Sequence, residues 1–200
     1  MTIVEGLKEK LKIVSKNLQL SSASRKKVIV IGSQYHIGRA TLLALSSLHD
    51  ETVDAYAGTD DKIMNAANID GIQDVQANLA DTAGLARSLV GYDAAYIVVP
   101  CHGGGTQLTI NGIQAAKQAD VKFILLLSVI GQDSDEATFE KKFQPIRDAV
   151  EDSGIEYSII KLPLEPEKPV AVGDVGKESA KILADPSDHV GKEYKFEASH

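Results

Sequence analysis

From residue 28 onward, short unbroken apolar runs alternate with longer stretches in which apolar residues recur every three or four positions. The runs are typical of parallel strands buried on both faces, and the longer stretches of helices. Strands are expected at residues 28–31, 53–57, 72–77, 94–99, 123–128, 157–161 and 194–196. Helices are expected at 37–48, 61–68, 82–89, 106–119, 139–153 and 175–183, the last with Asp174 as its N-cap. This alternation predicts βαβ units in one α/β domain, residues 28–200, with a doubly wound parallel sheet.

The first 20 residues have a helical pattern of their own. Val4, Leu7, Leu11, Val14 and Leu18 form one apolar stripe, which predicts an amphipathic N-terminal helix over residues 1–20. Polar residues 21–27 are expected to form a linker. The stripe must be buried, either on the body of the same chain or against a second copy in a short coiled-coil homodimer.

Composition narrows the class of protein. The chain has 200 residues, of which 44% are hydrophobic and 24% charged, as in globular domains. No window approaches the ~20 consecutive apolar residues that a membrane helix needs. The single cysteine, Cys101, favours a reducing compartment, so we expect a cytoplasmic protein. The five histidines show no metal-site spacing, and no metal is expected.

Charge divides the chain into two unequal parts. The first 27 residues hold seven Lys and Arg against two Glu, and the whole chain has a net charge of −7, so the rest carries −12. Nucleic-acid binding needs clustered positive charge on the body of a domain. The acidic body therefore argues against a nucleic-acid partner.

The segment after the first expected strand is a candidate phosphate-binding turn. In a doubly wound sheet, ligands bind outside the carboxyl ends of the strands, and residues 32–39, GSQYHIGR, lie between such a strand and a helix. Gly32 can make the sharp turn and Gly38 lets the helix approach the strand. The first amides of the helix, near Ile37, would point at a pyrophosphate. Tyr35 stands where a glycine would let the backbone approach, so its ring must swing aside or block the site.

With these features, the sequence resembles the NmrA-like branch of the atypical short-chain dehydrogenase/reductases over most of residues 28–197. Besides the turn, the resemblance rests on VQANLAD (75–81), GYD (91–93), AAKQA (115–119), SGIEYSIIK (153–161), LADP (183–186) and GKEY (191–194). It implies a Rossmann-like fold that binds NAD(P). It also implies an NAD(P)-dependent oxidoreductase acting on a small carbonyl or alkene substrate.

The same resemblance assigns a cofactor site. The residues implied are Gly32, Gln34, Tyr35, His36, Ile37, Gly38 and Arg39 in the turn, Gly58 and Thr59 after the second strand, Asn78 and Leu79 near the adenine, and Val99 and Pro100 near the nicotinamide ribose. Asn78 replaces the usual Asp but keeps a carbonyl acceptor. Arg39 and Lys62 could bind the 2′-phosphate of NADP, whereas Asp60 and Asp61 favour the free ribose of NAD. We expect NADP.

The catalytic residues depart from those of the wider superfamily. Phe143 stands where the family often has a lysine, with Lys142 just upstream, and Lys161 replaces the usual arginine. Tyr157 and Lys161 have the four-residue spacing of a catalytic pair but lie in an expected strand, where they would be ~13 Å apart. The candidate catalytic residues are therefore Ser128, Lys142 and Lys161.

Two further features keep a second function open. The run CHGGG (101–105) is similar to a hydrolase oxyanion loop, but no Gly-x-Ser-x-Gly elbow accompanies it, so we interpret it as a flexible loop beside the cofactor. Only twelve residues separate Lys161 from Asp174, where full-length relatives carry a substrate-covering lobe. Water would reach such a crevice. The alternative is a non-catalytic dinucleotide sensor or protein-interaction module that binds no cofactor tightly.

Overall fold

The structure is a computed structural model that describes residues 25–47, 53–59, 69–99, 104–130, 136–163 and 170–196. The strands are β1 (Lys26–Ile31), β2 (Val53–Thr59), β3 (Gln73–Gln76), β4 (Ala94–Ile97), β5 (Phe123–Ile130), β6 (Glu156–Pro163) and β7 (Glu193–Lys195). The helices are α2 (His36–Ser46), α3 (Thr82–Ser88), α4 (Gly105–Gln118), α5 (Glu136–Ser153) and α6 (Val172–Ala184), followed by a 3-10 turn, η1 (Pro186–Asp188). Among these helices, none has the length and apolar character to cross a membrane.

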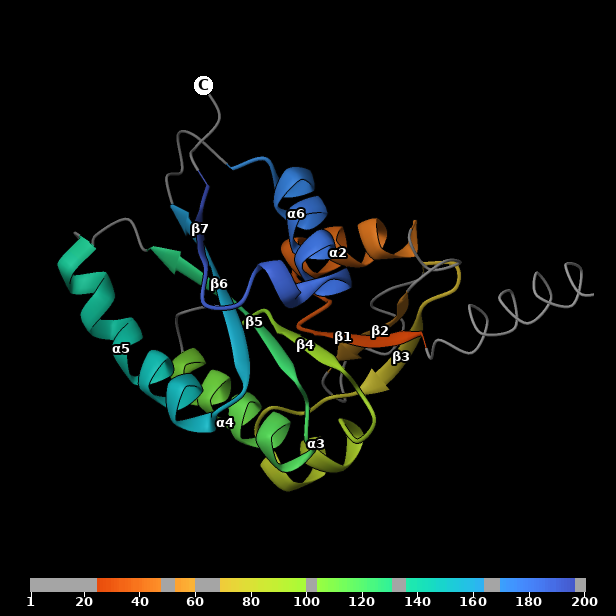
Figure 1. The fold of residues 1–200 in the computed structure, drawn as a ribbon, viewed down its shortest axis with the longest axis horizontal. Helices are drawn as coiled ribbons and strands as arrows, with labels where there is room; N and C mark the ends of the chain where they lie inside the picture. Colours follow the sequence, from red (N-terminus) through yellow and green to blue (C-terminus); the bar gives the residue numbers. More distant parts are fainter. Residues whose placement is uncertain are drawn as a thin grey trace, which may run out of the picture.

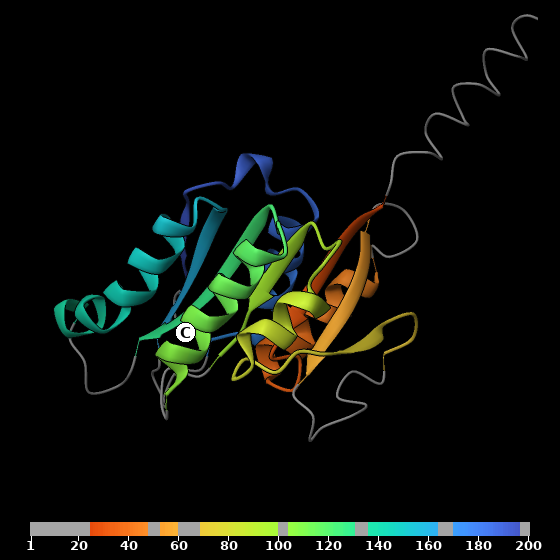
Figure 2. The same cartoon turned by 90° about the horizontal axis from the view of Figure 1, so that it is seen from below.

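The seven strands form one parallel sheet in the order β3-β2-β1-β4-β5-β6-β7. Helices α2 and α6 cover one face, and α3, α4 and α5 cover the other (Figures 1 and 2). The strand order reverses between β1 and β4, which is the switch point where doubly wound sheets bind ligands. The predicted Rossmann-like α/β fold is therefore confirmed.

The apolar runs build a core on each side of the sheet. Val28 and Val30 of β1 pack on the α2 and α6 side, whereas Ile29 and Ile31 pack on the side of α3, α4 and α5. All four are at most 1% exposed. Because successive strand residues point to opposite faces, a strand covered on both sides must be apolar at every position. This explains why the central strands show no polar alternation.

Helices α2 and α6 approach each other unusually closely. A Cβ on Gly176 of α6 would lie 2.6 Å from the backbone carbonyl carbon of Ala40 in α2. Only a residue without a side chain fits there, because carbon atoms make van der Waals contact at ~3.5–4 Å. Gly176 therefore sets how closely α6 supports α2, the helix that follows the candidate turn.

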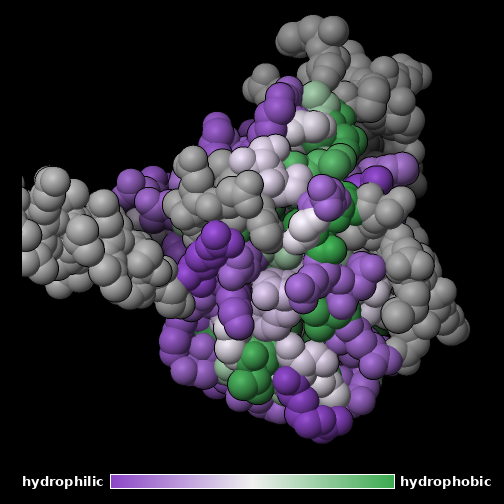
Figure 3. Space-filling view, turned by 90° about the vertical axis from the view of Figure 1, so that its right-hand side faces the viewer, coloured by the Kyte–Doolittle hydropathy of each residue, from purple (hydrophilic) through white to green (hydrophobic). Residues whose placement is uncertain are grey.

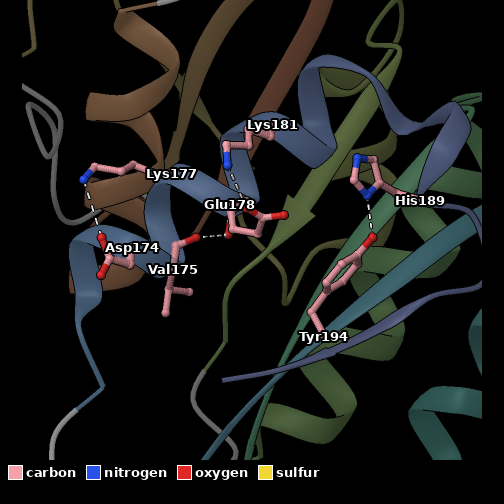
Figure 4. A network of polar contacts seen from close by, with 8 residues as sticks. Asp174, Val175, Lys177, Glu178, Lys181, His189 and Tyr194 are labelled. Atoms are coloured by element: carbon pink, nitrogen blue, oxygen red, sulfur yellow. Dashed lines mark hydrogen bonds and ion pairs between the residues drawn. The ribbon is translucent and has the colours of Figure 1, made fainter. Parts of the chain in front are cut away.

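The prediction that Asp174 is the N-cap of the last helix was wrong. Helix α6 begins at Val172, and its N-cap is Ala171, whose carbonyl accepts from the Asp174 N–H at 2.9 Å. Asp174 instead lies in the first turn, where a carboxylate is favoured by the positive end of the helix. Its side chain pairs with Lys177 at 3.5 Å, and Figure 4 shows this pair together with the contact between His189 and Tyr194.

Two predicted segments have different outcomes. Strand β1 already begins at Lys26, within the predicted linker. The predicted helices at 1–20 and 61–68 lie outside the described residues.

At the open edge of the sheet, β3 exposes Gln73, Asp74 and Gln76, which discourages pairing with another strand. Figure 3, the molecule seen from the right of Figure 1, where β3 lies, shows hydrophilic side chains among separate hydrophobic groups.

Candidate site at the switch point

The turn between β1 and α2 is fastened to the end of β2 by main-chain hydrogen bonds. The N–H groups of Gly32 and Ser33 donate to the Gly58 carbonyl at 3.1 and 3.4 Å, and the Ser33 hydroxyl donates to the same oxygen at 3.2 Å. A Cβ on Gly58 would lie 3.1 Å from the Ile31 Cα. Gly58 and its buried neighbour Thr59 therefore lie beside the turn and support it from below.

Both glycines of the turn are required by close contacts. Gly32 has φ +90°, and a Cβ there would lie 2.0 Å from the carbonyl oxygen of Val98, just after β4. A Cβ on Gly38 would lie 2.5 Å from the Gly32 carbonyl oxygen. The first contact seats the turn against β4, and the second seats α2 on the turn. These are the sharp turn and close approach that the sequence predicts for Gly32 and Gly38.

The start of α2 presents backbone N–H donors just after the carboxyl end of β1. The first regular helical bond runs from the Arg39 N–H to the Tyr35 carbonyl, at 2.9 Å. Among the described residues, no acceptor is found for the N–H groups of His36, Ile37 and Gly38. Such unpaired amides at the positive end of a helix are suited to bind an anionic group such as a phosphate.

Tyr35 adopts an ordinary backbone conformation. Its φ of −84° and ψ of 152° need no glycine, so tyrosine causes no backbone strain at this position. The side chain is 39% exposed, and its Cδ2 lies 3.2 Å from where a Cβ on Gly32 would be. The ring is therefore folded back over the turn, in the place where the second glycine of a dinucleotide turn leaves space.

Gln34 carries a buried acceptor that nothing satisfies in the described part of the chain. Its Oε1 atom is excluded from solvent and has no hydrogen-bond partner there. Buried polar atoms almost always have partners, and an unpartnered one is costly. A hydrogen-bond donor on a bound ligand would remove this cost. Gln34 is therefore a residue of the turn that a ligand would stabilise directly.

The loop after β3, where the adenine is expected, is held from two directions. The Asn78 Oδ1 accepts from the Ala80 N–H at 2.8 Å, which orients the side chain. The Leu79 carbonyl accepts from the Asn111 side chain of α4 at 2.9 Å, and Gly112 leaves room for the Leu79 side chain. The sequence analysis did not predict this role of Asn111. The only signal in the sequence is that a polar residue stands next to apolar positions of an expected helix.

The candidate catalytic residues are only partly brought together. Ser128 and Lys161 are register partners on β5 and β6, and Ser128 is fully buried, with no partner for its hydroxyl among the described residues. Lys142 is exposed on α5, next to the buried Phe143. Tyr157 lies on β6 with Lys161, as predicted, and donates its hydroxyl to Glu151 at 3.2 Å. Tyr157 and Lys161 therefore do not form a helical catalytic pair.

Lys161 takes part in an ion-pair network that the sequence did not predict. Glu193 of β7 pairs with Lys161 at 2.7 Å and with Arg147 of α5 at 2.6 Å. Burial raises the pKa of the Glu193 carboxyl, but hydrogen bonds from Lys161 and Arg147 outweigh burial and hold this pKa below its ordinary value. The network joins the edge strand β7 to α5 and β6.

Replacing Glu193 by glutamine should lower the free energy of unfolding by about 1 kcal/mol at pH 7, because two partly buried cations lose their counter-ion. The charged form of Glu193 is stabilised in the folded state. Its contribution is therefore present above the ordinary carboxyl pKa of about 4.3 and is lost as the pH falls below it. Urea unfolding from pH 7 to about pH 3.5 measures this, with Glu156→Gln as control. A difference between the wild type and Glu193→Gln that does not change with pH would contradict the assignment.

Several expected site residues lie outside the described part of the chain. Asp60, Asp61 and Lys62, which bear on the choice between NAD and NADP, are among them. So are residues 100–103, which follow β4 and include Pro100. Val99, the last described residue there, is 7% exposed. Within the described ranges no group of three or more His, Cys, Asp and Glu could hold a metal ion.

Comparison with known proteins gives one family and several structural neighbours. A family model described as NAD(P)H-binding matches residues 32–181. No curated protein matches the chain. The matched residues run from the first glycine of the turn into α6, so they include the turn, the loop after β3 and the β5–β6 pair.

The solved structures agree on the fold at low identity. A Rossmann-fold NAD(P)-binding family protein from Shigella flexneri is 20% identical, with a TM-score of 0.68, and the match covers 88% of this chain and 94% of that one. The NADPH-dependent quinone oxidoreductase from Escherichia coli, complexed with NADPH, is 20% identical, with a TM-score of 0.67 and coverages of 84% and 68%. Triphenylmethane reductase from Citrobacter sp. is 15% identical, with a TM-score of 0.70 and the same coverages.

Proposed function

The chain belongs to the NAD(P)H-binding family, and from this premise we propose that it is an NmrA-like, NAD(P)-dependent oxidoreductase that reduces a small carbonyl or alkene substrate. The observation that carries the proposal is the set of three N–H groups at His36, Ile37 and Gly38, which have no acceptor in the described part of the chain and follow a turn that admits only glycine at positions 32 and 38. The quinone and dye reductases among the structural neighbours support a reductase.

The described residues fit a dinucleotide. The amides of residues 36–38 would take the pyrophosphate, and the orphaned Gln34 Oε1 would accept from a hydroxyl or amide of the ligand. Asn78 and Leu79 would take the adenine end, and Val99 with Pro100 the nicotinamide ribose. Arg39, exposed in the first turn of α2, supports NADP over NAD. The single Cys101 supports a cytoplasmic location.

The residues on β5 and β6 supply the rest of the chemistry. The bound dinucleotide would supply a hydride to the substrate. The Ser128 hydroxyl lies two residues beyond the Leu126–Ile97 pair, level with Val99, and has no partner among the described residues, so it is the group that would donate to a substrate oxygen. The Lys161 ammonium, on the paired strand, would favour the developing negative charge on that oxygen. Lys142, exposed on α5, could contact the substrate itself.

One observation favours a non-catalytic dinucleotide sensor as the second candidate. The Lys161 ammonium beside Ser128 is already held in an ion pair with Glu193, which Arg147 also contacts, so it is less available to a substrate. Calorimetry with NADPH and NADH tests binding, and NADPH oxidation with a panel of quinones, aldehydes and enones tests catalysis. Binding with turnover supports the reductase, and binding without turnover on any substrate class supports the sensor. The absence of binding would overturn both.

Replacing Tyr35 by glycine should tighten NADPH binding by at least about tenfold, equivalent to ~1.4 kcal/mol. The ring is folded over Gly32, and a pyrophosphate that approaches the turn must displace it. Calorimetry on the wild type and on Tyr35→Gly measures the change, and Tyr35→Phe serves as control because it keeps the ring. A wild type that already binds in the low micromolar range, with no gain on substitution, would show that the ring does not obstruct the site.

A further inference from the structure

The groove between α4 and α5 is unfilled in the described part of the chain. It consists of two adjoining hollows of about 470 and 510 Å³ that share Lys117 and Ser153. Ile110, Ile113, Pro145 and Ala149 give it apolar walls. The two helices lie side by side on the face opposite α2 and α6 (Figures 1 and 2), and none of the residues that line the groove belongs to the proposed cofactor site. The groove is thus separate from the proposed cofactor site.

We propose that residues 1–20 of the same chain dock in this groove, with the stripe from Val4 to Leu18 on its apolar walls. Leu18 would lie near Lys117 and Ser153, and Val4 toward the opposite end of the groove. The proposal concerns an internal interaction surface and does not depend on the proposed enzymatic function. Three independent properties of the chain support it.

The first property is where the chain enters the fold. Lys27, at the start of β1, is joined to the rim of the groove through main-chain bonds: its carbonyl accepts from the Asp93 N–H at 2.9 Å, and the Asp93 carbonyl accepts from the Lys122 N–H at 3.0 Å. Lys122 lines the groove. Strands lie ~4.8 Å apart and helices pack ~10 Å above a sheet, so the groove is on the order of 15 Å from β1. The seven Cα-to-Cα steps from Leu18 to Arg25 can span ~23 Å.

The second property is length. As a helix, the stripe from Val4 to Leu18 would extend over ~21 Å, at 1.5 Å per residue. Helix α4 has 14 residues and is therefore also ~21 Å long, and α5, with 18 residues, is somewhat longer. The lining of the groove begins at Ile110 on α4 and at Pro145 on α5, so the groove is shorter than these helices and would hold the central turns of the stripe.

The third property is charge. The groove is bordered by Asp120, Asp148, Asp152 and Glu156, against the two cations Lys117 and Lys122. Lys122 and Asp120 pair with each other at 2.5 Å, which leaves Asp148, Asp152 and Glu156 against Lys117. Residues 1–20 hold four lysines against two glutamates, a net charge of +2. An acidic rim around apolar walls is complementary to a lysine-rich helix with one apolar stripe. Because the linker is short, it favours docking within the chain over docking on a second copy.

A disulfide test in the full chain measures this placement directly. In a Cys101→Ser background, Val14→Cys combined with Gln114→Cys should cross-link within one chain at least about tenfold faster than Val14→Cys combined with Leu43→Cys. Gln114 lies in the groove, and Leu43 is exposed on α2 on the opposite face. Equal rates for the two pairs would overturn the proposal. A cross-link formed only between chains would also overturn it and would indicate a homodimer.

A double-mutant cycle in the full chain provides a second measurement. Leu11→Lys and Ala149→Arg should each lower the melting temperature by several degrees, because each removes the same contact. Together they should lower it by no more than the larger single effect. Leu43→Lys, on the exposed side of α2, is the matched control and should combine additively with Leu11→Lys. Fully additive shifts for Leu11→Lys and Ala149→Arg, or no shift from Leu11→Lys, would show that the stripe does not occupy the groove.

Discussion

Gly38→Asp is expected to weaken NADPH binding by at least about 100-fold, or ~2.7 kcal/mol. Two effects act in the same direction. The new Cβ would lie 2.5 Å from the Gly32 carbonyl oxygen, which forces α2 away from the turn. The carboxylate would stand among the free amides of residues 36–38, where it repels a pyrophosphate and competes with it for the donors. Calorimetry with NADPH measures the loss.

Gly38→Ala separates the two effects, because alanine adds the Cβ without the charge. It should lose less affinity than Gly38→Asp, and both variants should retain the circular dichroism of the wild type. Unchanged affinity in a folded Gly38→Asp variant would mean that the dinucleotide, if bound, does not use this turn. The proposed site would then be wrong, whatever the activity of the protein.

Gly176→Val should lower the free energy of unfolding by about 3 kcal/mol, at the upper end of typical overpacking effects. Already the first side-chain atom would lie 2.6 Å from the Ala40 backbone, and backbone cannot rotate aside as a side chain can. Urea unfolding measures the loss. Gly173→Val is the matched control, because a Cβ at Gly173 of the same helix meets nothing within 4 Å. Equal losses at the two positions would show that helix propensity, and not the contact with α2, is responsible.

The regular elements of this fold were predictable because their energetics are local. A strand covered on both faces must be apolar throughout, so β1, β4 and β5 could be located from their composition alone. The turn was predictable because only glycine tolerates the contacts at positions 32 and 38. The N-cap of α6 was not, because Asp174 is favourable both as a cap and in a first turn, and sequence cannot separate the two.

The less predictable part of the site depends on residues far apart in the sequence. Glu193 meets Arg147 and Lys161 only after β7 has paired with β6, and Asn111 meets Leu79 only after α4 has packed beside the loop that follows β3. The orphaned Gln34 Oε1 is a property of burial, which depends on the whole fold. Tyr35 was recognised from the sequence as the main departure, but the position of its ring over Gly32 was not.

The three hydrogen bonds that the Gly58 carbonyl accepts from Gly32 and Ser33 have a consequence for sequence divergence in this family. Two of the three donors are main-chain N–H groups and the acceptor is a main-chain oxygen, so most of the anchor is independent of side-chain identity. Substitutions elsewhere can accumulate over evolutionary time while the turn keeps its shape. Such an anchor is compatible with the identity of only 15–20% to the solved structures that share this fold. It also means that Gly32, Gly38 and Gly58 should be among the slowest positions to change.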